Sequence, residues 1–320
     1  MATHLVRYEL GDRHRWGVVR GARIAPLDGE YPTTGSLIER GEPDWRAAAA
    51  RVPSLELSKV TLLSPVTAPA RVICQGANYR QHMLESGLDP DAKRFNMFFE
   101  KSDASISAPV GSLVRPAHVQ LLDYEIELAL VFRKSISGPV TVTASTLHEH
   151  VFGVTIANDV SARDVQLPQM QFFKGKSYRG FCPLGPNLAV LDPDDFRYLD
   201  QLALTLKVND AVRQQDTTAN LVFKPAETIT ELSTFSDLSP GDVLLTGTPA
   251  GCALRAPPPL VRRLMQLVLP EPKLWATFTR VQARRPQYLR PGDVVRGTIA
   301  SPDGAIDLGE QRHVVEGATA

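Results

Sequence analysis

The chain has 320 residues, a length that suits two domains or one large domain with an appendage. Lysine plus arginine number 35 and aspartate plus glutamate also number 35, so the formal net charge is zero. Because no basic field exists to attract a polyanion, we expect neither nucleic acid nor a membrane surface as a partner. The first residues lack the apolar core of a signal peptide, and no run approaches the roughly 20 apolar residues of a membrane span. These features predict a soluble, cytoplasmic protein.

A small N-terminal α/β domain is predicted over residues 1–65. Short β-like pieces at 4–10, 15–21 and 22–28 are separated by Gly-Asp and Gly-Ala turns. Two short helices are expected after them, at 34–40 and 43–52. Pro65 and Pro69 then favour extended backbone in the residues before them, which is typical of a junction between domains.

Residues 66–320 have a strand-rich pattern, which predicts a larger domain of the α+β class with a mixed or antiparallel sheet. Apolar runs recur at 71–76, 125–132, 151–159, 202–209, 242–248 and 293–299. Two of these runs follow a Pro-Gly sequence, which is an efficient turn before a strand. The segment at about 253–289 has the composition of an insertion, with helices expected at 260–269 and 273–284. Its apolar side chains need burial, so we expect it to be ordered against protein.

Two glutamates interrupt the apolar run LLDYEIELALVF at residues 121–132. If this segment is a strand, Asp123, Glu125 and Glu127 share one face, and the even-numbered residues form a clean apolar face towards the core. Neighbouring carboxylates repel each other unless a positive charge lies between them, and a hard divalent cation with oxygen ligands removes that conflict. A solvated strand face, or pairing with arginine, is the alternative interpretation. Asp159 ends another apolar run and would complete a cation site with positions left for a chelating substrate.

The segment GANYRQHMLESG at 76–87 predicts one short helix, with Asn78 as its N-cap and Gly87 as its stop signal. His82 and Glu85 lie three residues apart on this helix and are therefore expected to be adjacent. A glutamate that accepts from one imidazole nitrogen leaves the other nitrogen free to take a proton from water, as a general base requires. An ordinary surface histidine is the alternative interpretation.

Two lysines, Lys174 and Lys176, flank Gly175 in the segment at 172–186. The aromatic residues around them could desolvate one lysine beside the cation site. A lysine in that place would stabilise an enolate or carboxylate that develops on a substrate. A mobile surface loop is the alternative interpretation of this segment.

Seven segments, in order along the chain, resemble the fumarylacetoacetate hydrolase family. They are SPV at 64–66, GANYRQH at 76–82, DYEIELALVF at 123–132, NDVSARDVQ at 158–166, GKSYRGFCPLGP at 175–186, LLTGTPAG at 244–251 and PGDVV at 291–295. Each match is weak alone, and the ordered set is specific. The set is similar to bacterial two-domain members of the acylpyruvate or fumarylpyruvate hydrolase type and to 2-hydroxyhepta-2,4-diene-1,7-dioate isomerases.

The resemblance implies a mixed β-roll, sandwich-like catalytic domain and a homodimer that acts on a small keto acid. It implies a divalent metal, commonly Mg²⁺ but also Mn²⁺ or Ca²⁺, held by Glu125, Glu127 and Asp159. It also implies that His82 and Glu85 form a base dyad and that Lys176 is the catalytic lysine. The remaining matched positions are expected to contact the substrate: Tyr79, Arg163, Gln166 and Thr248.

From these features we expect a metal-dependent hydrolase that cleaves a C–C bond in an acylpyruvate-like 1,3-dicarbonyl acid, with His82 and Glu85 activating the water. A decarboxylase or an enol–keto isomerase of 2-oxo or β-keto acids is the nearest alternative, because the same residues stabilise the same enolate. A specialised biosynthetic or binding member is a further alternative. Two departures from the family pattern bear on the substrate: Arg179, where many members have an acidic residue, and the insertion at about 253–289.

Overall fold

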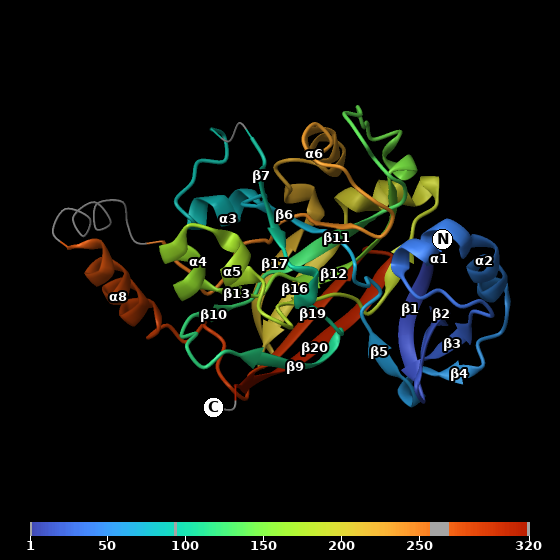
Figure 1. Ribbon diagram of the computed structural model, residues 1–320, viewed down its shortest axis with the longest axis horizontal. Coiled ribbons are helices and arrows are strands. Elements are labelled where there is room, and N and C mark those ends of the chain that lie inside the picture. The colour runs from blue at the N-terminus through green and yellow to red at the C-terminus, as the bar shows by residue number, and fades with distance from the viewer. Residues whose placement is uncertain (1, 93–94, 257–268, 319–320) are drawn as a thin grey trace.

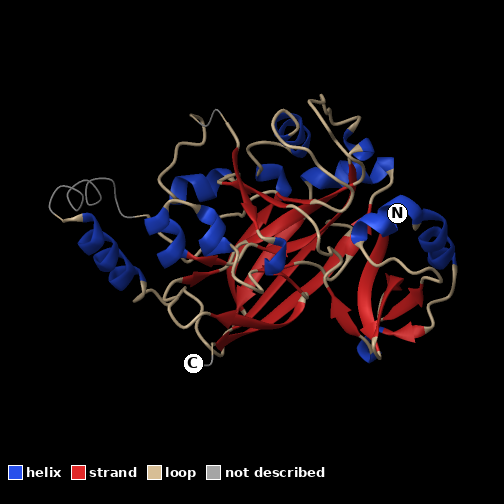
Figure 2. Cartoon of the chain, viewed as in Figure 1, coloured by secondary structure: helices blue, strands red, loops and turns tan. Residues whose placement is uncertain are grey.

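The computed structural model describes residues 2–92, 95–256 and 269–318, and its fold is strand-rich α+β as predicted (Figures 1 and 2). The strands are β1 (Thr3–Leu10), β2 (Arg13–Arg20), β3 (Arg23–Pro26), β4 (Leu55–Glu56), β5 (Thr61–Leu63), β6 (Val72–Gly76), β7 (Met97–Lys101), β8 (Ile106–Ser107), β9 (Val110–Arg115), β10 (Leu122–Asp123), β11 (Ile126–Phe132), β12 (Val151–Asn158), β13 (Ser161–Ala162), β14 (Cys182–Pro183), β15 (Leu188–Val190), β16 (Ala203–Val208), β17 (Ala211–Thr217), β18 (Val243–Leu245), β19 (Val294–Ala300) and β20 (Asp307–Gly317). The α-helices are α1 (Thr34–Arg40), α2 (Glu42–Ala50), α3 (Arg80–Glu85), α4 (Arg163–Gln169), α5 (Phe172–Lys176), α6 (Pro225–Leu232) and α8 (Glu271–Gln282). None of these described helices is long and apolar enough to cross a membrane.

Two large sheets account for most of the described strands. The larger has 11 strands in the order β4-β3-β2-β1-β15-β12-β11-β18-β6-β7, with β5 paired to β1. The smaller has 5 strands in the order β17-β16-β19-β20-β9. Both are mixed, because β18 pairs with β6 in parallel and β20 pairs with β9 in parallel. The six strands expected between residues 71 and 299 are all present.

The N-terminal strands β1 to β3 and the helices α1 and α2 form as the sequence predicts, at the right of Figure 1. Their strands belong to the same sheet as β11 and β12, because Thr3 to Leu5 of β1 pair with β15. The proposed division into residues 1–65 and 66–320 therefore crosses one uninterrupted hydrogen-bonded sheet. The two Pro-Gly turns also form as expected, since Gly241 and Gly292 have φ values of +92° and +94°.

Strand β11 is buried on both faces, which corrects the expectation of a single core face. Its even-numbered residues lie in one core with side chains of β16, β19 and β20 from the second sheet. Its odd-numbered residues Ala129 and Val131 lie in another core with Leu37 and Trp45 of the N-terminal helices. A strand covered on both sides has an almost continuous apolar sequence, as residues 126–132 do apart from Glu127. Glu127 is therefore a buried carboxylate, 3% exposed.

The insertion forms helix α8, which lies at the edge of the body beside α4 (Figure 1). The helix expected at 273–284 is thus present, two residues earlier than predicted. The helix expected at 260–269 falls almost entirely on residues 257–268, outside the described part of the chain.

Candidate active site

Strands β11 and β12 bring three carboxylates together at one end of their antiparallel ladder. Ile126 pairs with Asn158, so Glu125 and Asp159 are the next pair along, and the Asp159 amide donates to the Glu125 carbonyl at 2.8 Å. Glu127 follows on the same side of β11. One oxygen from each of the three carboxylates lies within 4.8 Å of the others, and all three side chains are buried.

Three buried cations surround this cluster. Lys176 Nζ donates to Glu125 Oε2 at 2.6 Å and to Asp159 Oδ2 at 2.5 Å. Lys101 Nζ donates to the other oxygen of Asp159. Arg163 donates to Glu125 and, at 2.9 Å, to Asp123 Oδ2. The alternative of arginine pairing is thus realised for Glu125, and the alternative of a solvated face is wrong.

Glu127 is the carboxylate that these cations leave without a partner in the described structure. It accepts one hydrogen bond, from the Gly247 amide at 2.7 Å. Burial, followed by repulsion from Asp159 and Glu125, raises the pKa of Glu127 well above its usual range. For Glu125 the burial is outweighed by the charges of Arg163 and Lys176, which lower its pKa.

The donor set of the cluster fits a hard divalent cation. Glu125, Glu127 and Asp159 offer only oxygen atoms, which suits Mg²⁺, Mn²⁺ or Ca²⁺ better than a thiolate-seeking metal. With Asp123 the site has four carboxylates against the three cations Lys101, Arg163 and Lys176, which leaves one formal negative charge in excess. The raised pKa favours a proton on Glu127, the carboxylate without a cationic partner in the described structure, and a bound cation could take the place of that proton.

Helices α4 and α5 position Lys176 through a close backbone contact. Lys176 is the last residue of α5, and the residue before it, Gly175, faces α4. A Cβ atom on Gly175 would lie 2.7 Å from the backbone nitrogen of Gln166, which is too close for any side chain. The glycine between the two lysines is therefore needed for α5 to reach the carboxylates, and the segment is a packed helix with Lys176 3% exposed.

The predicted dyad of His82 and Glu85 is not assembled in this structure. Both residues lie on α3, whose N-cap is Tyr79; the expected cap Asn78 instead bonds through its side chain to residues 223 and 246. The Glu85 carboxylate accepts from the Gly251 amide at 3.0 Å and pairs with Arg255 at 2.9 Å.

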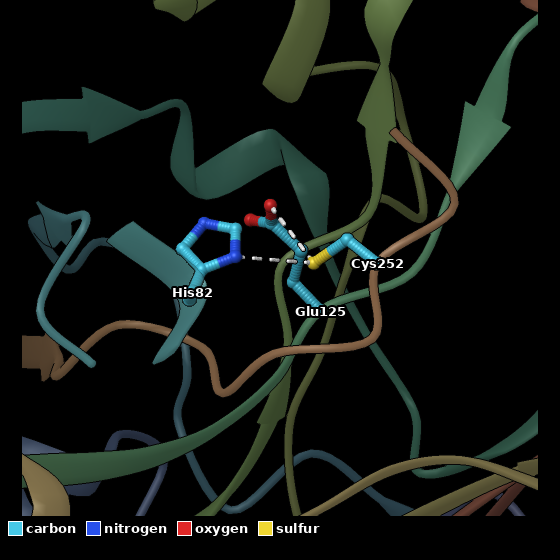
Figure 3. Close-up of side chains that lie close together, drawn as sticks. All are labelled: His82, Glu125 and Cys252. Carbon is cyan, nitrogen blue, oxygen red and sulfur yellow. Dashed lines mark hydrogen bonds between the residues drawn. The ribbon is translucent and has the colours of Figure 1, made fainter. Parts of the chain in front are cut away.

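A cysteine takes the place beside the imidazole that Glu85 was expected to occupy. Cys252 Sγ lies 3.9 Å from His82 Nδ1 and 3.9 Å from Glu125 Oε1, and the dashed lines in Figure 3 mark both contacts. Burial, with the charges of Glu125 and Asp123, raises the pKa of the Cys252 thiol well above its usual range. A buried thiol with a raised pKa is a weak neutral donor and a poor nucleophile. Burial also lowers the pKa of His82.

The expected substrate contacts divide into two groups. Arg163 and Gln166 line the cavity described below, and Arg163 Nη1 donates to Gln166 Oε1 at 2.9 Å, which leaves the amide nitrogen of Gln166 for a ligand. Thr248 lines it too, but its hydroxyl donates to the Ile126 carbonyl at 2.9 Å. Tyr79 is fully buried and is not among the described lining residues.

A cavity of about 340 Å³ opens onto the carboxylate cluster. Its polar lining consists of the three carboxylates and the following side chains: Gln75, His82, Ser86, Arg163, Gln166, Lys176 and Thr248. Its apolar lining comes from several elements: Leu88, Met97, Phe99, Leu167, Phe172, Leu254, Leu274, Trp275 and Phe278. A deep, mainly apolar pocket with a few convergent charged groups is typical of a small-molecule site.

Several site residues were not predicted from the sequence. Lys101 ends β7, and it contacts Asp159 although the two lie 58 residues apart in the chain. Asp123 was placed on the acidic face without a role; its carboxylate accepts from the amides of Ala253 at 2.8 Å and Leu254 at 3.1 Å and so fixes the start of the insertion. Among the lining residues that were not predicted, only the aromatic and apolar side chains of the insertion could be anticipated from the sequence, because such side chains need burial.

The family model for the C-terminal domain of fumarylacetoacetate (FAA) hydrolase matches residues 71–316. The chain belongs to the fumarylacetoacetate hydrolase family. A second model, described as Rv2993c-like, N-terminal, matches residues 3–65. The recognition made from the seven segments is therefore confirmed.

Two relatives in this family carry a tautomerase name. The mitochondrial oxaloacetate tautomerase FAHD2A of Bos taurus is 38% identical over 250 residues, which are 75% of this chain and 77% of that protein. Oxaloacetate tautomerase YisK of Bacillus subtilis (strain 168) is 37% identical over 207 residues, 63% of this chain and 66% of that protein. A solved structure, a probable 2-hydroxyhepta-2,4-diene-1,7-dioate isomerase from Mycobacterium abscessus, aligns with a TM-score of 0.72 and 30% identity over 99% of this chain and 100% of that one. The chain is thus a member of an enzyme family, and these three relatives are named as tautomerases or a probable isomerase.

Proposed function

We propose that the chain is a divalent-metal-dependent tautomerase that interconverts the enol and keto forms of a 2-oxo acid. The observation that carries this proposal is the presence, in one cavity, of the buried carboxylate triad, the His82 ring and the Lys176 ammonium. The relatives named as oxaloacetate tautomerases support the reaction class and make oxaloacetate the first substrate to test.

The reaction needs one proton to move between carbon and oxygen. In the keto-to-enol direction the neutral His82 ring would take a proton from C3, and in the reverse direction the same ring would return it. The lowered pKa of His82 favours the neutral ring that a base requires. A divalent cation at the triad would polarise the 2-oxo and carboxylate oxygens of the substrate.

Lys176 would stabilise the negative charge that develops on the enolate oxygen. Burial acts to lower the pKa of this lysine, but the charges of Asp159 and Glu125 outweigh the burial and raise it, so the ammonium keeps its proton. A permanently charged donor suits electrostatic stabilisation and does not suit proton transfer.

Hydrolytic cleavage, the activity expected first from the sequence, needs a base that activates water. The residue expected to orient His82 for that task, Glu85, is bonded to Gly251 and Arg255 instead. Tautomerisation consumes no water, so the observed geometry supports it better than hydrolysis.

The proposal is tested with the enol form of oxaloacetate, whose ultraviolet absorbance falls as the keto form appears. We expect the protein with Mg²⁺ to accelerate this loss, and His82→Ala to lower kcat by roughly 10² to 10⁴. His14→Ala, an exposed histidine on β2, is the matched control and should keep the wild-type rate. Enol decay at the buffer rate, or release of fragments with fewer carbons, would refute the proposal.

A further inference from the structure

The charged groups of the cavity lining belong to one cluster, which meets the apolar lining at Phe99, whose ring centroid lies 5.1 Å from Lys176 Nζ. Every charged nitrogen of Arg163 and Lys176 that the structure describes is directed at a carboxylate or at Gln166 within the cluster. The third basic group among the described lining residues is the neutral His82 ring, of which one nitrogen lies within 4.8 Å of a Glu125 oxygen. A substrate group that extends away from the cluster therefore meets apolar side chains.

Helix α8 contributes the most distinctive part of this apolar lining. Leu274, Trp275 and Phe278 all line the cavity, and their spacing of three and four residues places them on one face of the helix. The rings of Trp275 and Phe278 stack edge to face, with centroids 5.8 Å apart and an interplanar angle of 85°. Phe99 and Phe172 form a second edge-to-face pair in the lining, with centroids 5.2 Å apart.

The apolar face of α8 is fixed relative to the carboxylate cluster by hydrogen bonds. Gln282, the last residue of α8, donates to the Arg255 carbonyl at 3.0 Å, and Arg285 just beyond it donates to the Ala253 carbonyl at 3.1 Å. The backbone amide of Ala253 in turn donates to Asp123, which also holds Arg163. The apolar face of α8 and the charged cluster are thus joined by one chain of hydrogen bonds.

We propose that the preferred substrate is a 2-oxo acid with an aromatic or other apolar substituent on C3, in place of the second carboxylate of oxaloacetate. This inference rests on the proposed function and names its substrate class. A cavity of about 340 Å³ falls in the roughly 300–1,000 Å³ range that encloses drug-sized ligands, and is larger than a four-carbon diacid requires. Against the apolar face of α8, a distal carboxylate would lose water without gaining a cation from the described lining residues, which is unfavourable.

The reaction balances without a further reactant. The enol O–H bond and the C2–C3 π bond are lost, and a C2–O π bond and a C3–H bond are formed. The apolar substituent takes no part in this exchange. It determines only how well the substrate is held while His82 moves the proton.

The test compares kcat/KM for the enol forms of phenylpyruvate and oxaloacetate, each with Mg²⁺. We expect wild type to favour phenylpyruvate by at least about tenfold, the scale of one well-filled apolar contact. Trp275→Ala should lower kcat/KM for phenylpyruvate by about tenfold and change that for oxaloacetate little. Leu274→Arg should shift the preference towards oxaloacetate. Val281→Ala, on the same helix but 56% exposed and outside the described lining, should change neither value.

The outcomes separate this inference from the function on which it rests. Faster turnover of oxaloacetate than of phenylpyruvate by wild type would overturn the substrate class and leave the tautomerase intact. Equal losses for both substrates in Trp275→Ala would also overturn it, because the residue would then support the site in general. Turnover of neither enol would refute the proposed function itself.

Discussion

Replacing Glu127 with glutamine removes the one carboxylate of the cluster that has no cationic partner in the described structure. The Glu127→Gln side chain keeps an oxygen for the Gly247 amide, which now donates at 2.7 Å, and relieves the repulsion with Asp159 and Glu125. We therefore expect the metal-free variant to be at least as stable as metal-free wild type. Its affinity for a divalent cation should fall sharply, because a charged oxygen ligand is lost.

Differential scanning calorimetry with and without Mg²⁺ measures both effects. At a Mg²⁺ concentration 100 times its Kd, binding to the native state stabilises wild type by about 2.7 kcal/mol, or roughly 4 °C in Tm for a chain of this length. The variant should show almost none of this shift, whereas the exposed Glu30→Gln should show all of it. A full Mg²⁺ shift in Glu127→Gln would refute the metal assignment, and a collapse of the metal-free variant would show that the carboxylate is structural.

Three further predictions concern the groups around the cluster. Lys176→Met leaves two buried carboxylates short of a partner, so it should lower the free energy of unfolding, measured in urea, by roughly 3–5 kcal/mol. The exposed Lys174→Met is the control and should have little effect. Equal losses in the two variants would contradict the pairing. Burial lowers the pKa of His82, and only the neutral ring can accept a proton. The midpoint of the rising limb in a plot of kcat/KM against pH should therefore lie below pH 6.5. A midpoint above pH 6.5 would exclude His82 as the base. Gly175→Ala places a Cβ 2.7 Å from the backbone nitrogen of Gln166 and should therefore displace α5. We expect kcat to fall by up to about 10²-fold while the circular dichroism spectrum stays unchanged. A wild-type kcat would contradict this role of the glycine.

The carboxylate triad could be predicted because local alternation determines it. Glu125 and Glu127 stand two apart, and the residues from 126 to 132 are otherwise apolar, so a strand places the two glutamates on one face. Asp159 was found because it ends a second apolar run, and the β11–β12 pairing brings it beside Glu125. The aromatic residues around Gly175 indicated that one of its two flanking lysines could lie beside the site, and the family resemblance selected Lys176.

The rest of the site depends on contacts between distant parts of the chain. Lys101 has the sequence context of an ordinary strand end, and only the sheet order brings it to Asp159. Cys252 lies in a loop that the tertiary fold places against His82. The same loop engages Glu85, which is why helical spacing alone predicted a dyad that the structure does not contain. Side chains on short helices adopt the partners that the surrounding loops offer, and helical spacing does not specify those partners.

The most direct test of the central claim is proton NMR of a keto acid in D₂O with Mg²⁺, for oxaloacetate and phenylpyruvate in turn. A tautomerase must exchange the C3 protons of its keto substrate with solvent, so we expect the protein to accelerate loss of the C3 proton signal. The carbon skeleton should remain intact, and His82→Ala should remove the acceleration. Exchange at the buffer rate for both acids, or an accumulation of decarboxylated or cleaved products in place of exchange, would contradict the account.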